Sequence, residues 1–273
     1  MPRRGLLRLT AATVATLASA LTLTTGPSQA VVRVTGDSLP GADSVVPTSP
    51  TNAAKIFQWG LSDWEDEFID PLSASWRVSD PSRVRNQNGM LTLEGTSDGR
   101  PVTAKVAEHA RRYGRWEARV RSDYDDDGGT PYRVVWELVP VGRAGCGDGI
   151  TLATYTVGDH AAEMDIRAED GTAFTDQVPA DLGQYAWHTY AVEVTPDHIS
   201  WFADTKVLMT ERRPEALAGT RFRIRFRLEP VEGATMDFTR MQMDWVRYYT
   251  LQRPGAFPVD APEAQPVDFT PSC

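Results

Sequence analysis

The chain has 273 residues, of which 37 are acidic and 28 are lysine or arginine, so its formal net charge at pH 7 is −9. Nucleic acid and anionic membrane surfaces repel an acidic chain, and we expect neither as a partner. We also expect no cofactor, because the four histidines are scattered and the two cysteines lack the spacing of a metal site.

Residues 1–30 have the composition of a signal peptide. A basic start is followed by an uncharged apolar stretch from Leu9 to Leu23 and by the small-residue cleavage pattern Ser28-Gln29-Ala30. We therefore expect a secreted, extracellular protein whose exported form begins at Val31. In an oxidising compartment, a disulfide between Cys146 and Cys273 is favoured over a metal site.

The remainder divides by composition into three parts. Residues 31–54 are rich in Pro, Ser, Gly, Thr and Asp and have no apolar period, which predicts a flexible leader. Residues 55–251 have the length and patterning of one globular domain. Residues 252–273 contain five prolines and predict an extended, Pro-rich tail.

Alternating apolar and polar residues predict strands throughout residues 55–251. The clearest period-two segments are Arg115–Arg121, Tyr190–Val194, His198–Phe202, Phe222–Leu228 and Met241–Tyr249. Turn signals such as Asp127-Gly128-Gly129 separate the strands, and long amphipathic helices are missing from the pattern. The sequence therefore predicts an all-β fold, an antiparallel β-jelly-roll sandwich.

Five segments, in chain order, are similar to strands of glycoside hydrolase family 16, the laminarinase and lichenase-like enzymes. They are Trp64–Phe68, Tyr113–Val120, Val135–Pro140, Trp187–Phe202 and Met243–Tyr249. The resemblance covers most of residues 55–251 and implies a concanavalin-like sandwich. It also implies a monomer that binds β-glucan or a related polysaccharide and hydrolyses its O-glycosyl bonds through a glycosyl intermediate.

The segment Glu-Met-Asp-Ile-Arg at 163–167 carries the chemistry of this resemblance. The family's catalytic strand reads Glu-x-Asp-x-Glu, or Glu-x-Asp-x-x-Glu with a bulge: a nucleophile, a carboxylate that tunes it, and an acid/base. The resemblance assigns the nucleophile to Glu163 and the tuning carboxylate to Asp165. The acid/base position falls on Arg167 or Ala168, and neither can donate a proton at neutral pH.

Glu169 is the candidate that would replace the missing acid. On a regular strand it shares a face with Glu163 but stands about 20 Å away along the backbone. Retaining carboxyl pairs are about 5–5.5 Å apart and inverting pairs about 6.5–9.5 Å apart, so an extra bulge would be needed. The alternative is a charge-balanced row in which Arg167 pairs with Asp165 and Glu169.

Trp136 and Arg167 are the candidate substrate-binding residues. Trp136 lies in the segment similar to the family's cleft strand, where it would stack on a sugar; the alternative is a core tryptophan. Glu137 points to the opposite side of the strand and is expected to be a surface charge. Three functions stay open: a hydrolase, a non-catalytic glycan-binding or wall-associated protein, and a structural exported protein.

We expect no metal site in this chain. The acidic segment at 123–128 matches the start of a calcium loop, with oxygens at alternate positions and Gly128 at the turn. The glutamate that closes such a loop is replaced by Val134, so a solvated acidic turn is the better interpretation.

Overall fold

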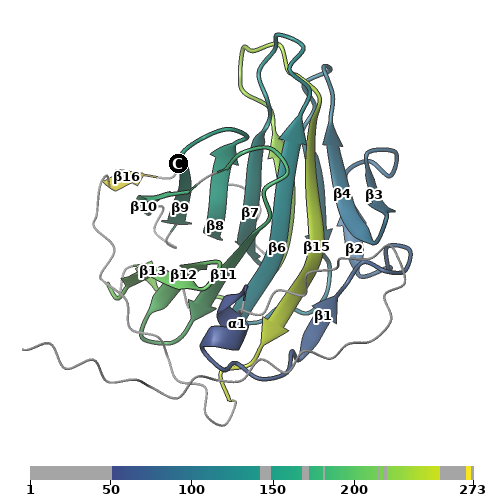
Figure 1. Ribbon diagram of the computed structural model, residues 1–273. Coiled ribbons are helices and arrows are strands. Elements are labelled where there is room, and N and C mark those ends of the chain that lie inside the picture. Colours follow the sequence, from purple (N-terminus) through teal and green to yellow (C-terminus); the bar gives the residue numbers. More distant parts are fainter. Residues whose placement is uncertain are drawn as a thin grey trace, which may run out of the picture. The chain divides into compact units, whose positions relative to one another are not determined.

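The computed structural model describes residues 51–141, 149–167, 172–180, 182–213, 216–217, 220–252 and 269–271. These residues form two layers of antiparallel strands and one short helix, which confirms the predicted fold class (Figure 1). The predictions for residues 1–50, for Cys146 and Cys273, and for Ala168 and Glu169 lie outside the described residues. No helix in the described ranges is long and apolar enough to cross a membrane.

Sheet A contains eight strands. They are β1 (Trp64–Asp66), β3 (Val84–Gln87), β4 (Met90–Gly95), β6 (Gly114–Tyr124), β11 (His188–Val194), β12 (Ile199–Ala203), β13 (Lys206–Glu211) and β15 (Thr239–Tyr249). Their order is β13-β12-β11-β6-β15-β4-β3, and β1 pairs with β15. The long strands β6 and β15 stand at the front of Figure 1.

Sheet B also contains eight strands. They are β2 (Trp76–Val78), β5 (Val102–Val106), β7 (Arg133–Pro140), β8 (Gly149–Thr156), β9 (Ala161–Arg167), β10 (Thr172–Pro179), β14 (Phe222–Glu229) and β16 (Phe269–Pro271). Their order is β16-β10-β9-β8-β7-β14-β5-β2. Strand β16 comes from the segment expected to be an extended tail, and it pairs with β10.

The hydrophobic core lies between the two sheets, and strand alternation decides which side chains reach it. In β14 the buried members are Phe222, Ile224, Phe226 and Leu228, and in β9 they are Ala162, Met164 and Ile166. Each buried Phe, Ile, Leu or Met side chain of this set stabilises the fold by about 1.5–3 kcal/mol. The intervening residues of both strands therefore point to the outer face of sheet B, the face turned away from the core.

A second cluster forms where the helix α1 (Ala53–Ile56) packs on the outer face of sheet A. Ala53 is fully buried, so the domain begins slightly before the boundary expected at Lys55. The carboxylate of Glu117 on β6 accepts hydrogen bonds from the backbone N–H of Ala54 at 3.2 Å and from Asn52 Nδ2 at 3.3 Å. Burial raises the pKa of Glu117 to about 7.

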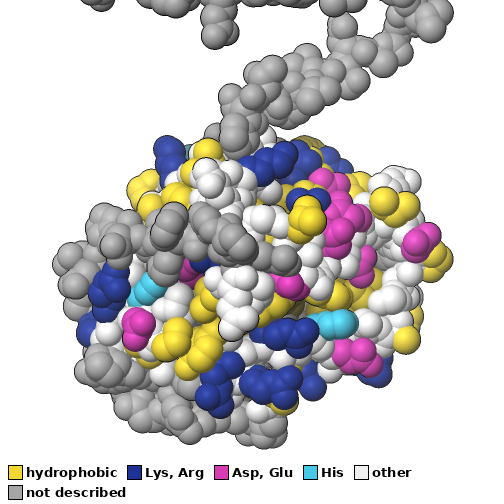
Figure 2. Space-filling model, turned by 90° about the horizontal axis from the view of Figure 1, so that it is seen from below, with side chains coloured by type: hydrophobic (Ala, Val, Ile, Leu, Met, Phe, Trp, Pro, Cys, Tyr) yellow, Lys and Arg dark blue, Asp and Glu magenta, His cyan; other side chains and the backbone are white. Residues whose placement is uncertain are grey.

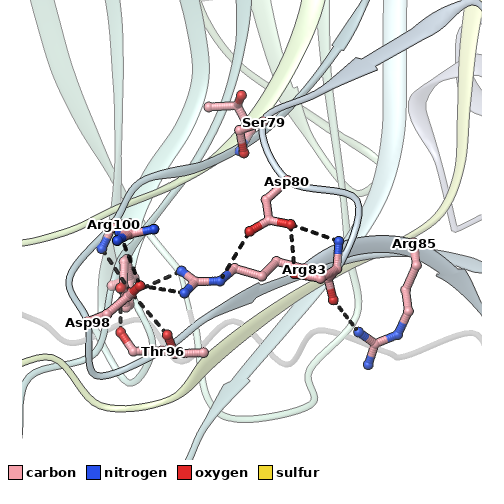
Figure 3. Close-up of polar contacts among 10 residues, drawn as sticks. Ser79, Asp80, Arg83, Arg85, Thr96, Asp98 and Arg100 are labelled. Atoms are coloured by element: carbon pink, nitrogen blue, oxygen red, sulfur yellow. Dashed lines mark hydrogen bonds and ion pairs between the residues drawn. The ribbon is translucent and has the colours of Figure 1, made fainter.

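Charged side chains at turns are paired locally. The Arg83 guanidinium lies between Asp80 and Asp98 and joins the turn before β3 to the turn after β4 (Figure 3). Arg100 contributes a further ion pair to Asp98 at 3.5 Å. Charged and hydrophobic side chains are likewise interspersed over the end of the molecule seen in Figure 2.

Candidate functional site

Glu163, Asp165 and Arg167 lie in a row on the outer face of sheet B. Strand β9 places them there because the residues between them face the core. The side chain of Glu163 is 34% exposed, whereas Asp165 is only 5% exposed. The structure therefore places on one face the two carboxylates to which the resemblance assigns the nucleophile and the tuning group, with Arg167 next in the row.

The surroundings of Asp165 shift the pKa of its carboxyl group. Burial raises the pKa of Asp165, and the negative charges of Glu137 and Glu163 add to the rise. The positive charge of Arg167, whose Nε lies 3.5 Å from Asp165 Oδ1, acts in the opposite direction and lowers this pKa. Thr151 lowers it as well through a hydrogen bond to the Asp165 carboxylate. Asp165 thus sits in an electrostatic cluster with two other carboxylates.

Glu137 is a member of this cluster that the sequence did not identify. It lies on β7 and points to the outer face, as its neighbour Trp136 points to the core, but it is buried and not the surface charge that was expected. Its Oε1 accepts hydrogen bonds from Arg225 Nε at 2.8 Å and from Arg227 Nε at 2.7 Å. Two charge-assisted hydrogen bonds from β14 therefore hold the Glu137 carboxylate in place.

Glu163 has a looser arginine neighbour. Arg133 Nη2 lies 4.0 Å from Glu163 Oε1, and Arg133 Nη1 lies 3.9 Å from Glu229 Oε2. Both side chains of the first pair are substantially exposed, and such pairs contribute little to stability, in the range of about 0–1 kcal/mol. Glu163 therefore remains the most accessible carboxylate of the cluster.

Trp136 requires a correction, because it belongs to the core. It is 1% exposed, and its ring stacks on Phe226 with the centroids 5.8 Å apart. The register of β7 turns Trp136 inward and Glu137 outward, and the indole has no face on the outer side of sheet B. The core alternative replaces the expectation that Trp136 stacks on a sugar.

Six residues, directly opposite one another, cross sheet B perpendicular to its strands. This transverse row consists of Asp165, Thr151, Glu137, Arg225, Lys105 and Arg77, on β9, β8, β7, β14, β5 and β2 in turn. Its acids stand on β9 and β7, and its cations stand on β14, β5 and β2. With neighbouring strands about 4.8 Å apart, the row extends for about 24 Å.

The arrangement can bind hydroxyl and charged groups of an extended polymer that lies across the strands. The cations of the row can donate hydrogen bonds to such a polymer, whereas Asp165, Thr151 and Glu137 are at most 5% exposed. The Oδ1 of Asp165 is buried and accepts no hydrogen bond within the described part of the chain, and Arg167 Nε lies 3.5 Å from it. No group of three or more His, Cys, Asp or Glu among the described residues could hold a metal ion.

The sequence and the structure were compared with known proteins. The sequence matches no protein-family model and no curated protein. Among solved structures, one similar chain is a non-specific endo-β-1,3(4)-glucanase from glycoside hydrolase family 16 with an oligosaccharide at its active site. The TM-score is 0.60 at 15% identity, covering 70% of this chain and 94% of the glucanase.

Two further structures show the same likeness. The laminarinase from Rhodothermus marinus is 16% identical over 69% of this chain and 96% of its own, with a TM-score of 0.56. A chain described with the endo-acting O-glycanases that human gut microbiota use to initiate mucin breakdown is 17% identical over 70% of this chain and 100% of its own, with a TM-score of 0.58. This chain therefore has the β-jelly-roll fold of the family 16 glycoside hydrolases.

Proposed function

We propose that this chain is an exported protein that binds a polysaccharide on the outer face of sheet B without cleaving it. One observation carries the proposal: without a bulge the acid/base position of the family motif falls on Arg167, and the guanidinium of Arg167 is ion-paired with Asp165. A glycoside hydrolase needs a group that protonates the leaving oxygen, and arginine stays protonated at any physiological pH. The family's usual mechanism therefore lacks its proton donor at this position.

The fold and the surface chemistry support a glycan as the ligand. The glucanase of similar structure is described with an oligosaccharide at its active site, and β-glucan or a related polysaccharide is the corresponding ligand here. Polar and charged side chains cross the outer face of sheet B, as binding of a hydroxyl-rich chain requires. A monomer suffices for this binding, since the row is built from one chain.

Hydrolysis is the second candidate, and the environment of Asp165 favours it. Burial raises the pKa of Asp165, which is the direction that a general acid needs. Residues 163 and 165 are separated by about 6.6 Å along a strand, close to the carboxyl separations of glycosidases. In this version Glu163 attacks the sugar and Asp165 or Glu169 protonates the leaving oxygen.

The experiment that tests the proposal compares binding and cleavage on the same polymers. The exported form, Glu163→Gln and the control Glu232→Gln, which changes an exposed acid of a turn, are run through gels containing laminarin, lichenan, agarose or a charged polysaccharide. Reducing-sugar release is measured in parallel. We expect at least one polymer to retard all three proteins, and we expect no release from any of them.

Other results decide against the proposal. Release by the unmodified protein and by Glu232→Gln, but not by Glu163→Gln, would establish the hydrolase instead. No retardation and no release on any polymer would refute glycan binding and leave a structural protein.

A further inference from the structure

The cations of the transverse row stand directly opposite one another. Arg225 on β14 pairs in register with Lys105 on β5, and Lys105 pairs with Arg77 on β2. Like charges in opposite positions destabilise neighbouring strands. The three charges are spread over about 10 Å, two strand spacings, on one side of the outer face. A fold that keeps such a row has local positive potential there despite its acidic composition.

The acids near these cations are too few to neutralise them. Arg225 and Arg227 donate to the same oxygen of Glu137, and Arg227 also forms an ion pair with Glu229 at 2.7 Å, so two acids stand among five cations, Arg77, Lys105, Arg223, Arg225 and Arg227. Arg77 donates to the backbone oxygens of Ala74 and Trp76. Within the described residues, neither Arg77 nor Lys105 has an ion-pair partner.

Arg223 is a further cation on the outer face of sheet B, on the same strand as Arg225 and Arg227. It lies two residues before Arg225 and is therefore turned outward with it. Its Nε is buried and donates no hydrogen bond to any described residue. A buried guanidinium donor without an acceptor is unfavourable, and an oxyanion brought by a ligand would satisfy it. Arg83, in contrast, is held between two aspartates (Figure 3).

We propose that the polysaccharide bound on this face carries oxyanions, as carboxylate or sulfate ester groups, on the sugars that lie over β14, β5 and β2. Guanidinium groups match both oxyanions because they donate parallel hydrogen bonds in a planar fork. The inference rests on the proposed function, glycan binding on this same face, and it names the class of glycan.

The acidity of the whole chain does not oppose this assignment. At physiological ionic strength the screening length is about 8 Å, so a bound sugar is governed by the charges beneath it. The acids of the row, Glu137 and Asp165, lie at the other end, where they are buried and paired with arginines. The negative net charge of the chain disfavours non-specific capture of polyanions, so binding of a polyanion would indicate a local site.

The test uses matched polymers that differ only in charge. The pairs are dextran sulfate with dextran, and polygalacturonate with its methyl ester. Affinities are measured by gel retardation and calorimetry at low and physiological salt. We expect the charged member of at least one pair to bind, the neutral member to bind at least tenfold more weakly, and added salt to weaken the charged complex. Which pair responds distinguishes sulfate ester from carboxylate.

Two double variants locate the binding. Lys105→Gln with Arg77→Gln removes two cations of the row that have no ion-pair partner among the described residues. Lys55→Gln with Lys206→Gln removes two exposed cations from α1 and β13, on the sheet A layer. Both proteins are expected to melt within a few degrees of the unmodified chain. The first should lose affinity for the charged polymer about tenfold or more, and the second should keep it.

Three outcomes would overturn the inference, and they separate it from the proposed function. Binding of neutral glucans with no preference for charged polymers leaves glycan binding intact and refutes the charged class. An equal loss of affinity for the charged polymer in both double variants would show a general attraction of polyanions. Binding of single-stranded DNA as tightly as the charged polysaccharide would show the same. Failure to bind any polysaccharide removes the proposed function and this inference together.

Discussion

Replacing Glu193 with glutamine is expected to destabilise the protein by about 3–5 kcal/mol, because it breaks a buried ion pair from one side. Glu193 is 0% exposed, and its Oε2 accepts a hydrogen bond from Arg115 Nε at 2.6 Å, while Arg115 is itself 1% exposed. The other oxygen of Glu193 lies 2.9 Å from His198 Nε2. Glutamine keeps the shape of the side chain but leaves the charge of Arg115 uncompensated in the interior.

The measurement is urea or thermal unfolding of the Glu193→Gln protein, with Glu232→Gln as the exposed control. For a domain of 150–250 residues, a loss of this size corresponds to a fall in Tm of about 6–20 °C. Arg115→Met combined with Glu193→Leu removes both charges and should cost clearly less than the sum of the two single changes. A loss below about 1 kcal/mol for Glu193→Gln, or strictly additive single changes, would refute the reasoning.

Three further outcomes follow from the described contacts. The pKa of Glu117 is raised from 4.5 to about 7, so the folded form keeps this proton to a higher pH than the unfolded form does. The free energy of unfolding should therefore fall by about 3 kcal/mol as the pH rises from about 4.5 to about 7. Denaturant titrations across that range should show a flatter profile for Glu117→Gln, and equal profiles would contradict the burial argument. Arg167→Gln should raise the pKa of Asp165 further, as followed by carboxyl NMR, and Arg133→Gln should change it less; the reverse order would be inconsistent with the 3.5 Å pair. Trp136→Phe should lower stability without changing polysaccharide affinity, and a selective loss of affinity would return Trp136 to the ligand face.

Strand positions were predictable wherever one face is buried. The alternation in Phe222–Leu228 predicts a strand with its arginines on one side, and β14 has this form. The segments predicted at Arg115–Arg121 and Met241–Tyr249 lie within the longer strands β6 and β15. Period two appears in the sequence because the core accepts only every second residue.

The site was predictable only along its own strand. The sequence places Glu163, Asp165 and Arg167 on one face by counting residues, and β9 shows them there. Glu137 and Lys105 join them through strand pairing, and pairing register depends on contacts between segments far apart in the chain. The expectation that Trp136 stacks on a sugar was wrong for the same reason, since the pattern of one sequence does not say which side of β7 faces the core.

The pairing of β16 with β10 has a consequence for handling the protein. Strand β10 is the neighbour of β9, and β16 occupies its free hydrogen-bonding edge at Thr172, Ala173 and Phe174. A shortened chain that stops after Leu251 would expose those backbone N–H and C=O groups as a template for another strand. Such a chain is expected to self-associate through β10, two strands from the middle of the proposed glycan-binding face, so that truncation would expose an unpaired strand edge close to that face.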